Sequence, residues 1–188
     1  EHGSFKPDLA PIKMSNLCSE IDLPTKPLNS FDDEEGEIAL CSLSAINWGS
    51  FKEPEDMERA CNLAVRGLDS LLSYQEYPVK AAQNATEKRR PLGVGIINLA
   101  YFLAKHGVGY NDEEGLELVD TWAQHWSYYL IKASVELAQE EGACPLSNET
   151  KYSDGILPVD TYKKEVNEVI KHKNKVDWAS LRKDLKKY

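Results

Sequence analysis

Three polar side chains at alternate positions of one short segment have the types that a small active surface needs. In the stretch SNLCSEI, Cys18 carries a thiol, Asn16 a carboxamide two residues before it and Glu20 a carboxylate two residues after it. In an extended segment, alternate side chains point to the same side. We therefore expect these three groups to face one reaction partner, while Leu17 and Ile21 anchor the segment in a core.

The same pattern also has an interpretation without chemistry. A free cysteine is most often a small, buried and unreactive hydrophobic residue. Three polar residues at alternate positions also form a solvated edge. The spacing around Cys18 therefore needs support from the rest of the chain.

The other cysteines, Cys41, Cys61 and Cys144, lie far from Cys18 and from one another. They have neither the CxxC pairs of a zinc site nor the density of a disulfide-bonded secreted domain, so we expect no metal site. A cytosolic thiol pair, if one forms, is then more often catalytic than structural. Cys61 lies on the apolar stripe of a predicted helix and is expected to belong to the core.

The composition disfavours several classes of partner. The 188 residues carry a formal net charge of -9, whereas phosphate binding depends on clustered Lys and Arg, so nucleic acid is not expected as a partner. We interpret the short basic runs at 88–90 and 183–187 as solvated faces. No apolar stretch approaches the roughly 18 residues that cross a bilayer, and no signal peptide is evident. We expect a soluble, cytoplasmic protein without a membrane partner.

The elements that must position these groups fall into two parts. Residues 1–50 combine proline-containing loops, a short extended segment around Cys18 and a mostly apolar stretch at 37–47. That stretch is typical of a buried strand and contains Cys41. The rest of the chain is predicted to be mostly helical. Helical spacing predicts helices at 53–75, 112–142, 161–170 and 178–187.

Two features of the helical part have more than one interpretation. Gly93 and Gly95 precede an apolar run that ends at Gly107. A glycine pair ahead of a helix can hold a phosphate on backbone N–H groups, but GxGxxG and the P-loop lysine are absent. We therefore favour tight packing of a strand or loop against the helix at this pair. His125 lies off the apolar stripe of its helix and is expected to be exposed.

The segments around Cys18 and Cys41 resemble the large, catalytic subunit of class I ribonucleotide reductase. SNLCSEI at 15–21 is similar to the thiyl-radical loop of that family, and LPTKPLN with GEIALCSLSAINWG is similar to the segment that bears its redox cysteine. RRPLGVGIINLAYFLAK and GILPVDTYKK resemble the helical region that follows. The similarity covers essentially the whole chain and is of the enterobacterial and T-even phage type.

The resemblance implies an α/β fold in which residues 1–188 form the central, mostly helical part of a ten-stranded barrel domain with a central finger loop. As a thiyl radical at the tip of that loop, Cys18 would remove the 3′ hydrogen of a ribonucleoside diphosphate. Glu20 would accept the proton of the 3′ hydroxyl, and Asn16 would orient the sugar hydroxyls and Glu20. The substrate contacts would come from Asn16, Leu17, Cys18, Ser19 and Glu20.

Reduction of the sugar needs two electrons, which two thiols supply as they close to a disulfide. The resemblance gives one of these roles to Cys41, with a partner upstream of this chain. It also implies a radical from a di-iron tyrosyl small subunit, electrons from thioredoxin or glutaredoxin, a homodimer of the complete large subunit, and no cofactor held by this segment. The sequence starts without Met and ends within a helical pattern, so we expect an internal piece that has no turnover alone.

Two other interpretations stay open. Cobalamin-dependent and glycyl-radical relatives share a finger-loop cysteine, although SNLC together with GEIALC favours class I. The second alternative is a non-catalytic helical fragment or a decayed gene remnant, whose cysteines are bystanders. The intact surroundings of Cys18 and Cys41 argue against decay.

Overall fold

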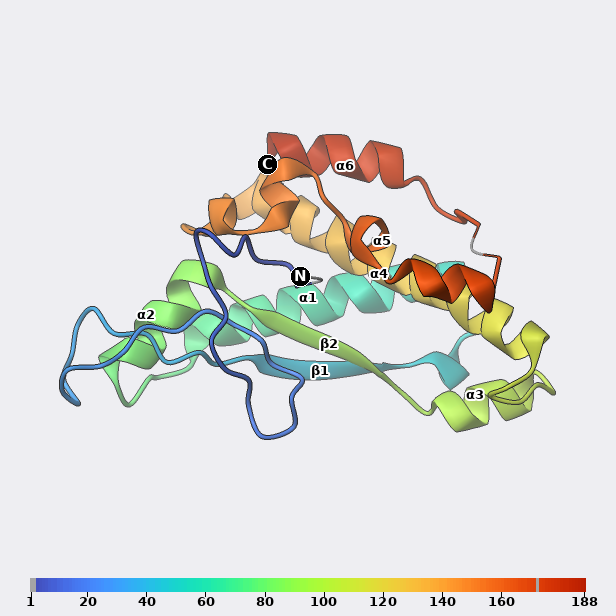
Figure 1. Cartoon of the computed structure of the whole chain (residues 1–188), viewed down its shortest axis with the longest axis horizontal. Coiled ribbons are helices and arrows are strands. Elements are labelled where there is room, and N and C mark those ends of the chain that lie inside the picture. Colours follow the sequence, from blue (N-terminus) through green and yellow to red (C-terminus); the bar gives the residue numbers. More distant parts are fainter. Residues whose placement is uncertain (1–2, 172) are drawn as a thin grey trace.

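The computed structural model describes residues 3–171 and 173–188, in which helices pack around a small sheet (Figure 1). The strands are β1 (Ser42–Asn47) and β2 (Leu92–Ile97). The α-helices are α1 (Glu58–Tyr74), α2 (Lys80–Arg89), α3 (Leu99–Lys105), α4 (Glu113–Glu141), α5 (Pro158–Thr161) and α6 (Trp178–Lys187). Short 3₁₀ helices lie at Trp48–Ser50, Pro54–Met57, Ser147–Glu149, Lys151–Asp154 and Lys164–Glu168. The described residues therefore combine helix and strand, with helix predominant.

The two strands are parallel and directly paired. Ser42 lies opposite Leu92 at one end of the ladder, and Asn47 lies opposite Ile97 at the other. Parallel strands need a crossover connection, which α1 and α2 supply between β1 and β2. This crossover places the segments around residues 42 and 92 side by side.

The sheet has one covered face and one open face. Ile46, Val94 and Ile96 point toward the helices and belong to the main core or pack against it. Alternate positions point the other way, so Leu43 is 60% exposed and Ile97 is 52% exposed. We call this second side the open face. The strand predicted at 37–47 is confined to Ser42–Asn47, so Cys41 precedes it, and the expectation that the strand is buried is wrong on the open face.

The main core lies between the covered face, α1, α3 and α4. It is formed by Ile46, Trp48, Met57, Cys61, Phe102, Leu103 and Trp122. The rings of Phe102 and Trp122 meet edge to face with centroids 4.6 Å apart, a preferred geometry for aromatic pairs. This core fixes the carboxyl end of β1, because Trp48 directly follows the strand and is 1% exposed.

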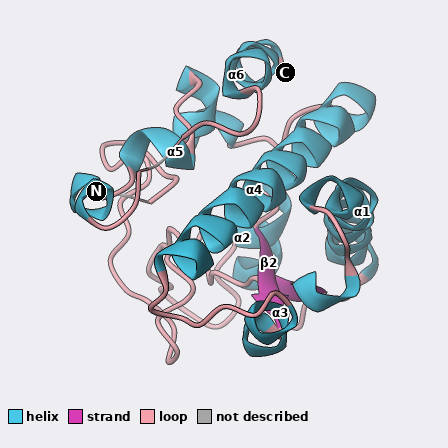
Figure 2. Cartoon of the chain, turned by 90° about the vertical axis from the view of Figure 1, so that its right-hand side faces the viewer, coloured by secondary structure: helices cyan, strands magenta, loops and turns pink. Residues whose placement is uncertain are grey.

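A second, smaller core attaches the carboxyl-terminal segments to α4. Val135, Leu157, Trp178 and Leu181 form it. Figure 2 shows α4 running between α1 on one side and the α5 and α6 layer on the other. Because α4 contributes to both cores, it is the element that joins the two halves of the structure.

The helices predicted at 53–75, 112–142 and 178–187 are confirmed, apart from small differences at their ends. The helix predicted at 161–170 is wrong. Tyr162 and Lys163 adopt extended backbone with ψ of 156° and 119°, and they separate α5 from a short 3₁₀ helix. Helix α2 was not predicted, because its buried face consists mainly of small residues, including Ala81, Ala82 and Ala85, instead of a stripe of large apolar ones.

The exposure predicted for His125 is also wrong, since this side chain is buried. Its Nδ1 lies 2.9 Å from the carbonyl oxygen of Thr121, one turn earlier in α4. Its Nε2 lies 3.4 Å from Oε1 of Glu55, in the 3₁₀ helix that precedes α1. His125 therefore makes polar contacts at the place where α4 packs against the 3₁₀ helix before α1.

Candidate active site on the open face of the sheet

The segment around Cys18 forms a turn instead of the extended strand that the alternating pattern predicts. The backbone N–H of Ser19 donates to the carbonyl oxygen of Asn16 at 3.1 Å, which closes the turn. Ser19 has a φ of 59°, in the left-handed region that residues other than glycine seldom adopt. Cys18 therefore lies at the tip of a tight loop, between Asn16 and Ser19. The prediction of extended backbone around Cys18 is therefore wrong.

The side chain of Asn16 holds this turn together. Its Oδ1 accepts hydrogen bonds from the backbone N–H groups of Glu20 at 3.1 Å and Ile21 at 3.0 Å. Its Nδ2 donates to Oε1 of Glu20 at 2.6 Å. Asn16 and Glu20 thus meet as predicted, but the turn brings them together, and the alternation of a strand does not.

The tip of the loop is fully open to solvent. Leu17 is 100% exposed, so the prediction that it anchors the segment in a core is wrong. The anchoring expected of Ile21 is met only partly, because this residue is half-buried. Cys18 and Ser19 are exposed. The thiol at the tip is accessible to a reaction partner.

Cys41 lies directly before β1 and is partly buried. Burial raises the pKa of its thiol, and the negative charge of Glu20 raises it further. The return of the chain from the turn thus brings the Glu20 carboxylate close enough to act on Cys41. Asn16, Glu20 and Cys41 share one neighbourhood, with Cys18 on the turn between the first two.

The other two cysteines lie elsewhere. Cys61 is fully buried in α1, where burial, together with the charge of Glu58, raises the pKa of its thiol to about 12. This agrees with the core role predicted for Cys61. Cys144 follows α4 and has a pKa raised by burial. The charged groups that act on these thiols are Glu58 for Cys61, and Arg90 and Asp69 for Cys144, whereas Glu20 acts on Cys41.

Both stems of the N-terminal loop are held by backbone bridges. The stem that enters the loop is fixed at Phe5, which pairs antiparallel with Thr150. The stem that returns from it is fixed where Lys26 pairs antiparallel with Glu37, and we call these two the entering stem and the returning stem. In Figure 1 the blue N-terminal segment forms a loop that projects on the side of the strands away from α4 and α6. The turn that carries Cys18 is therefore suspended between two fixed points.

A buried ion-pair network strengthens this attachment. Glu37 has a fully buried carboxylate, which pairs with Arg89 at the end of α2 and with Lys26 at 3.1 Å. Arg89 Nε also lies 2.8 Å from Oε2 of Glu149. Burial alone would raise the pKa of Glu37, but Arg89 and Lys26 outweigh it and hold the pKa below its usual value. The network ties the returning stem to α2 and to the segment next to Thr150.

Sequence reasoning missed this network and misjudged the basic run at 88–90. The side chain of Arg89 is 5% exposed, and Arg90 pairs with Asp69 of α1 at 2.6 Å, so the run is only partly a solvated face. The partners of Arg89 lie 52 and 60 residues away in the chain, and no local pattern points to them.

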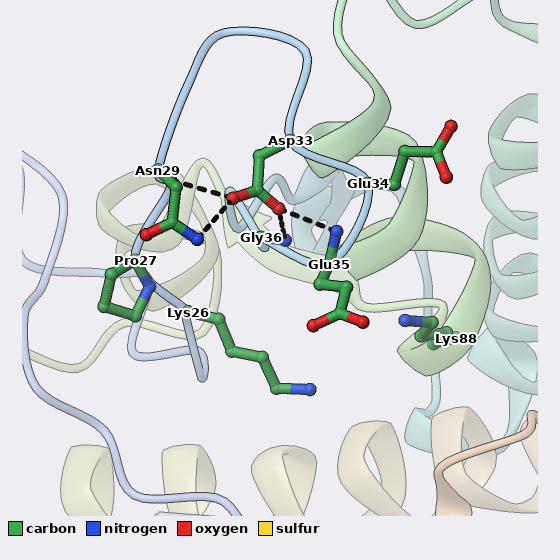
Figure 3. A pocket seen from close by; sticks show the side chains of 8 residues that line it. All are labelled: Lys26, Pro27, Asn29, Asp33, Glu34, Glu35, Gly36 and Lys88. Atoms are coloured by element: carbon green, nitrogen blue, oxygen red, sulfur yellow. Dashed lines mark hydrogen bonds between the residues drawn. The ribbon is translucent and has the colours of Figure 1, made fainter.

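A surface pocket of about 470 Å³ lies beside the returning stem, and no cysteine lines it (Figure 3). It is lined by Lys26, Pro27, Asn29, Asp33, Glu34, Glu35, Gly36 and Lys88. Asp33 closes the turn at 29–36 by accepting hydrogen bonds from the backbone N–H groups of Asn29, Glu35 and Gly36, and these bonds lower the pKa of Asp33 to about 2. The lining lacks a nucleophile, and its carboxylates disfavour a phosphate. The pocket is therefore a surface feature of the returning stem and is not the candidate active site.

Within the described residues, no group of three or more His, Cys, Asp and Glu side chains is arranged to hold a metal ion. Over the same ranges, no helix combines the length and apolar character needed to span a membrane.

Comparison with known proteins identifies the family of this arrangement. A family model described as "Ribonucleotide reductase, barrel domain" matches residues 1–188. The chain belongs to the ribonucleotide reductase family. Among curated relatives, the ribonucleoside-diphosphate reductase subunit alpha of Haemophilus influenzae is 51% identical over 187 residues, which cover 100% of this chain and 25% of the relative.

Two more relatives come from the two groups, enterobacterial and T-even phage, that the motifs predicted. The ribonucleoside-diphosphate reductase 1 subunit alpha of Escherichia coli is 51% identical over 98% of this chain and 24% of its own length. The corresponding subunit alpha of Enterobacteria phage T4 is 41% identical over 97% of this chain and 24% of its own length. The chain thus spans about a quarter of the ribonucleotide reductase subunits that it matches, and the predicted bacterial and T-even phage type is confirmed.

Proposed function

We propose that this chain is the segment of a class I ribonucleoside-diphosphate reductase that carries the hydrogen-abstracting thiol and one of the two reducing thiols. The substrate is a ribonucleoside diphosphate and the product is the corresponding deoxyribonucleoside diphosphate. Residues 1–50 supply the finger loop and a strand, and residues 51–188 supply mostly helices, to a ten-stranded α/β barrel. The open face of β1 and β2 supports this assignment, because further strands and loops can cover it.

Cys18 begins the reaction. As a thiyl radical it takes the 3′ hydrogen atom of the ribose, and at the end of the cycle it returns a hydrogen atom, so the thiol is regenerated. Its position at the exposed tip of a tight turn supports this role, because the sulfur can reach a substrate without moving the core. Leu17 and Ser19, on either side, are exposed and would contact the same substrate.

Glu20 and Asn16 act on the sugar hydroxyls. The carboxylate of Glu20 takes the proton of the 3′ hydroxyl as the 2′ hydroxyl leaves as water, which is general base catalysis. A carboxylate is ionised near neutral pH and suits this role. The bond from Asn16 Nδ2 to Glu20 Oε1 fixes the base, while the second carboxylate oxygen is left to face the substrate.

Cys41 supplies reducing equivalents. Together with a second thiol from outside this chain it closes to a disulfide, and the two protons and two electrons released reduce the sugar as one water leaves. Burial and the charge of Glu20 keep Cys41 in its thiol form, which carries the hydrogen that the reaction consumes. Thioredoxin or glutaredoxin would reduce the disulfide again.

The remaining partners follow from the class. A small subunit with a di-iron centre and a tyrosyl radical would generate the radical, and the complete large subunit would be a cytoplasmic homodimer. The name "subunit alpha" that the relatives share supports a second type of subunit.

The observation that carries the proposal is the contact between Asn16 and Glu20 across the turn that presents Cys18, with the charge of Glu20 acting on Cys41. The test replaces Cys18 by Ser in the complete reductase, assembled with its small subunit. We expect reduction of CDP to fall below detection, because a hydroxyl O–H bond is too strong to form the radical, while CDP binding is unchanged. Cys144→Ser is the matched control and should keep activity. Turnover by Cys18→Ser at the wild-type rate would refute the proposal.

A further inference from the structure

Gly93 in β2 lies against the thiol of Cys41. The two residues are on neighbouring strands, since Cys41 precedes β1 and Gly93 is paired with Leu43 across the ladder. By strand alternation, positions 41, 43, 93 and 95 all point to the open face. Gly93 is therefore part of the immediate surroundings of the sulfur, on the side where the finger loop returns.

A side chain at position 93 has no room. A Cβ placed there would lie 3.0 Å from Sγ of Cys41 and 2.5 Å from Cδ2 of Leu43, whereas ordinary contacts begin at 3.4 Å. Gly95, two residues further along the same strand, differs in this respect. A Cβ at that position would meet only the carbonyl oxygen of Ser44, at 3.9 Å.

The two contacts at Gly93 differ in how easily they can be relieved. The atom of Leu43 that is contacted, Cδ2, is at the far end of a flexible side chain, which can move it away by changing rotamer. Cys41 is partly buried and has a single side-chain torsion, so its sulfur can retreat only by changing rotamer or by moving the start of β1. A methyl group at position 93 would therefore displace the sulfur.

Backbone conformation does not explain the glycine. Neither Gly93 nor Gly95 has a positive φ, so alanine can adopt the backbone at both positions. In a strand interior, alanine is even favoured over glycine. The requirement at position 93 is for space alone. The expectation that this glycine pair packs tightly against the helix is wrong, because the close neighbours of Gly93 are Cys41 and Leu43 and that of Gly95 is Ser44.

We propose that Gly93 is a positioning residue for the reducing thiol: its missing side chain lets the sulfur of Cys41 rest against β2 in the orientation that disulfide closure requires. This inference rests on the proposed function of Cys41. Disulfide geometry is narrow, with Cβ atoms about 3.5–4.5 Å apart and a torsion near 90°. A misplacement of about 1 Å at a reacting centre can reduce a rate by about 100-fold.

The test compares Gly93→Ala with Gly95→Ala in the complete reductase. One turnover is followed in the presence of CDP, and the fraction of Cys41 found in a disulfide is measured by mass spectrometry after quenching. We expect Gly93→Ala to slow disulfide formation by at least about tenfold and Gly95→Ala to change it by less than about twofold, with CDP affinity unchanged in both. Equal rates in the two variants, or an equal loss in both, would overturn the inference.

A double variant shows which contact matters. In Gly93→Ala/Leu43→Ala the contact with Leu43 is removed, and only the contact with the sulfur of Cys41 is left. We expect disulfide formation to stay slow relative to Leu43→Ala alone. Recovery of the rate would mean that Gly93 makes room for Leu43, which would overturn the inference.

Cys41→Ser separates this inference from the proposed function. If Cys41→Ser sustains repeated turnover, Cys41 is not a reducing thiol and the proposed function itself fails. If Cys41→Ser loses turnover while Gly93→Ala forms the disulfide at the normal rate, the proposed function stands and the role given to Gly93 is wrong.

Discussion

At the scale of single residues, the site depends on how Asn16 satisfies its hydrogen bonds. Its amide oxygen accepts hydrogen bonds from two backbone N–H groups, and its amide nitrogen donates one to the carboxylate of Glu20. An asparagine is suited to this position because its side chain carries both an acceptor and a donor. The donor fixes the position of the Glu20 carboxylate, which is proposed as the general base.

Asn16→Asp keeps the shape and the acceptor but replaces the donor by a second carboxylate. The two carboxylates would lie about as close as the present contact of 2.6 Å, where they cannot both be ionised. One apparent pKa of the pair must rise, so the base is protonated at higher pH. We expect the acid side of the pH profile of CDP reduction to move upward by about one pH unit or more. Asn16→Ala, which adds no charge, should shift it less.

An unchanged profile in Asn16→Asp would mean that Glu20 is not the group whose ionisation limits the reaction at low pH. The measurement is the rate of CDP reduction by the complete reductase between about pH 5 and pH 9, a range that spans the shift expected from a carboxylate pair.

At the scale of elements, the turn is positioned by its stems, and the stems are held by charges that are buried. Arg89, at the carboxyl end of α2, pairs with Glu37 on the returning stem and with Glu149 near the entering stem. The two partners come from segments far apart in the sequence. A single guanidinium therefore coordinates three elements around the base of the loop.

Arg89→Gln should destabilise the chain strongly, because it leaves the buried carboxylate of Glu37 without its closest cation. Removing one partner of a buried ion pair costs about 3–5 kcal/mol. Since Lys26 and Lys88 still reach Glu37, we expect a loss of about 3 kcal/mol in the free energy of unfolding. Urea unfolding at pH 7, followed by tryptophan fluorescence, measures this loss.

Arg66→Gln is the matched control for this prediction. Arg66 also forms two hydrogen bonds to carboxylate oxygens, both of them from Glu140, but this pair is exposed to solvent. Exposed ion pairs contribute little, so the control should lose a small fraction of what Arg89→Gln loses. Similar losses in the two variants would contradict the importance given to the buried network.

At the scale of the whole molecule, the described strands leave one face of the sheet uncovered, with Leu43 and Ile97 largely exposed on it. The family assignment places these residues in a barrel domain, and the relatives are about four times as long as this chain. With the proposed function, part of the substrate cavity and the second reducing thiol would come from outside residues 1–188.

We therefore expect the 188 residues on their own to show no turnover of CDP, even with the small subunit and a dithiol reductant present. The measurement is deoxycytidine diphosphate formed over several hours, with the complete reductase as the positive control. Detectable product from the isolated chain would contradict the need for further segments and would change the view of where the second thiol lies.

Sequence patterns alone determined the family and most of the helices. SNLCSEI and the stretch around Cys41 pointed to the family, and the apolar spacing located α1, α4 and α6. Such signals are local, because a helix repeats its apolar positions every three to four residues and a reactive loop keeps its side chains close in sequence. Where the local signal was weak, as in α2 with its alanine face, the prediction failed.

The tertiary structure alone decided the turn at Cys18, the burial of Arg89 and the contact between Gly93 and Cys41. Alternating polar residues fit a strand and a tight turn equally well, and the hydrogen bonds of Asn16 select the turn. The contacts of Arg89 and Gly93 join residues about 50 or more positions apart. Such contacts arise only when the crossover between β1 and β2 brings distant segments together, because burial and close approach depend on neighbours in space and not on neighbours in the chain.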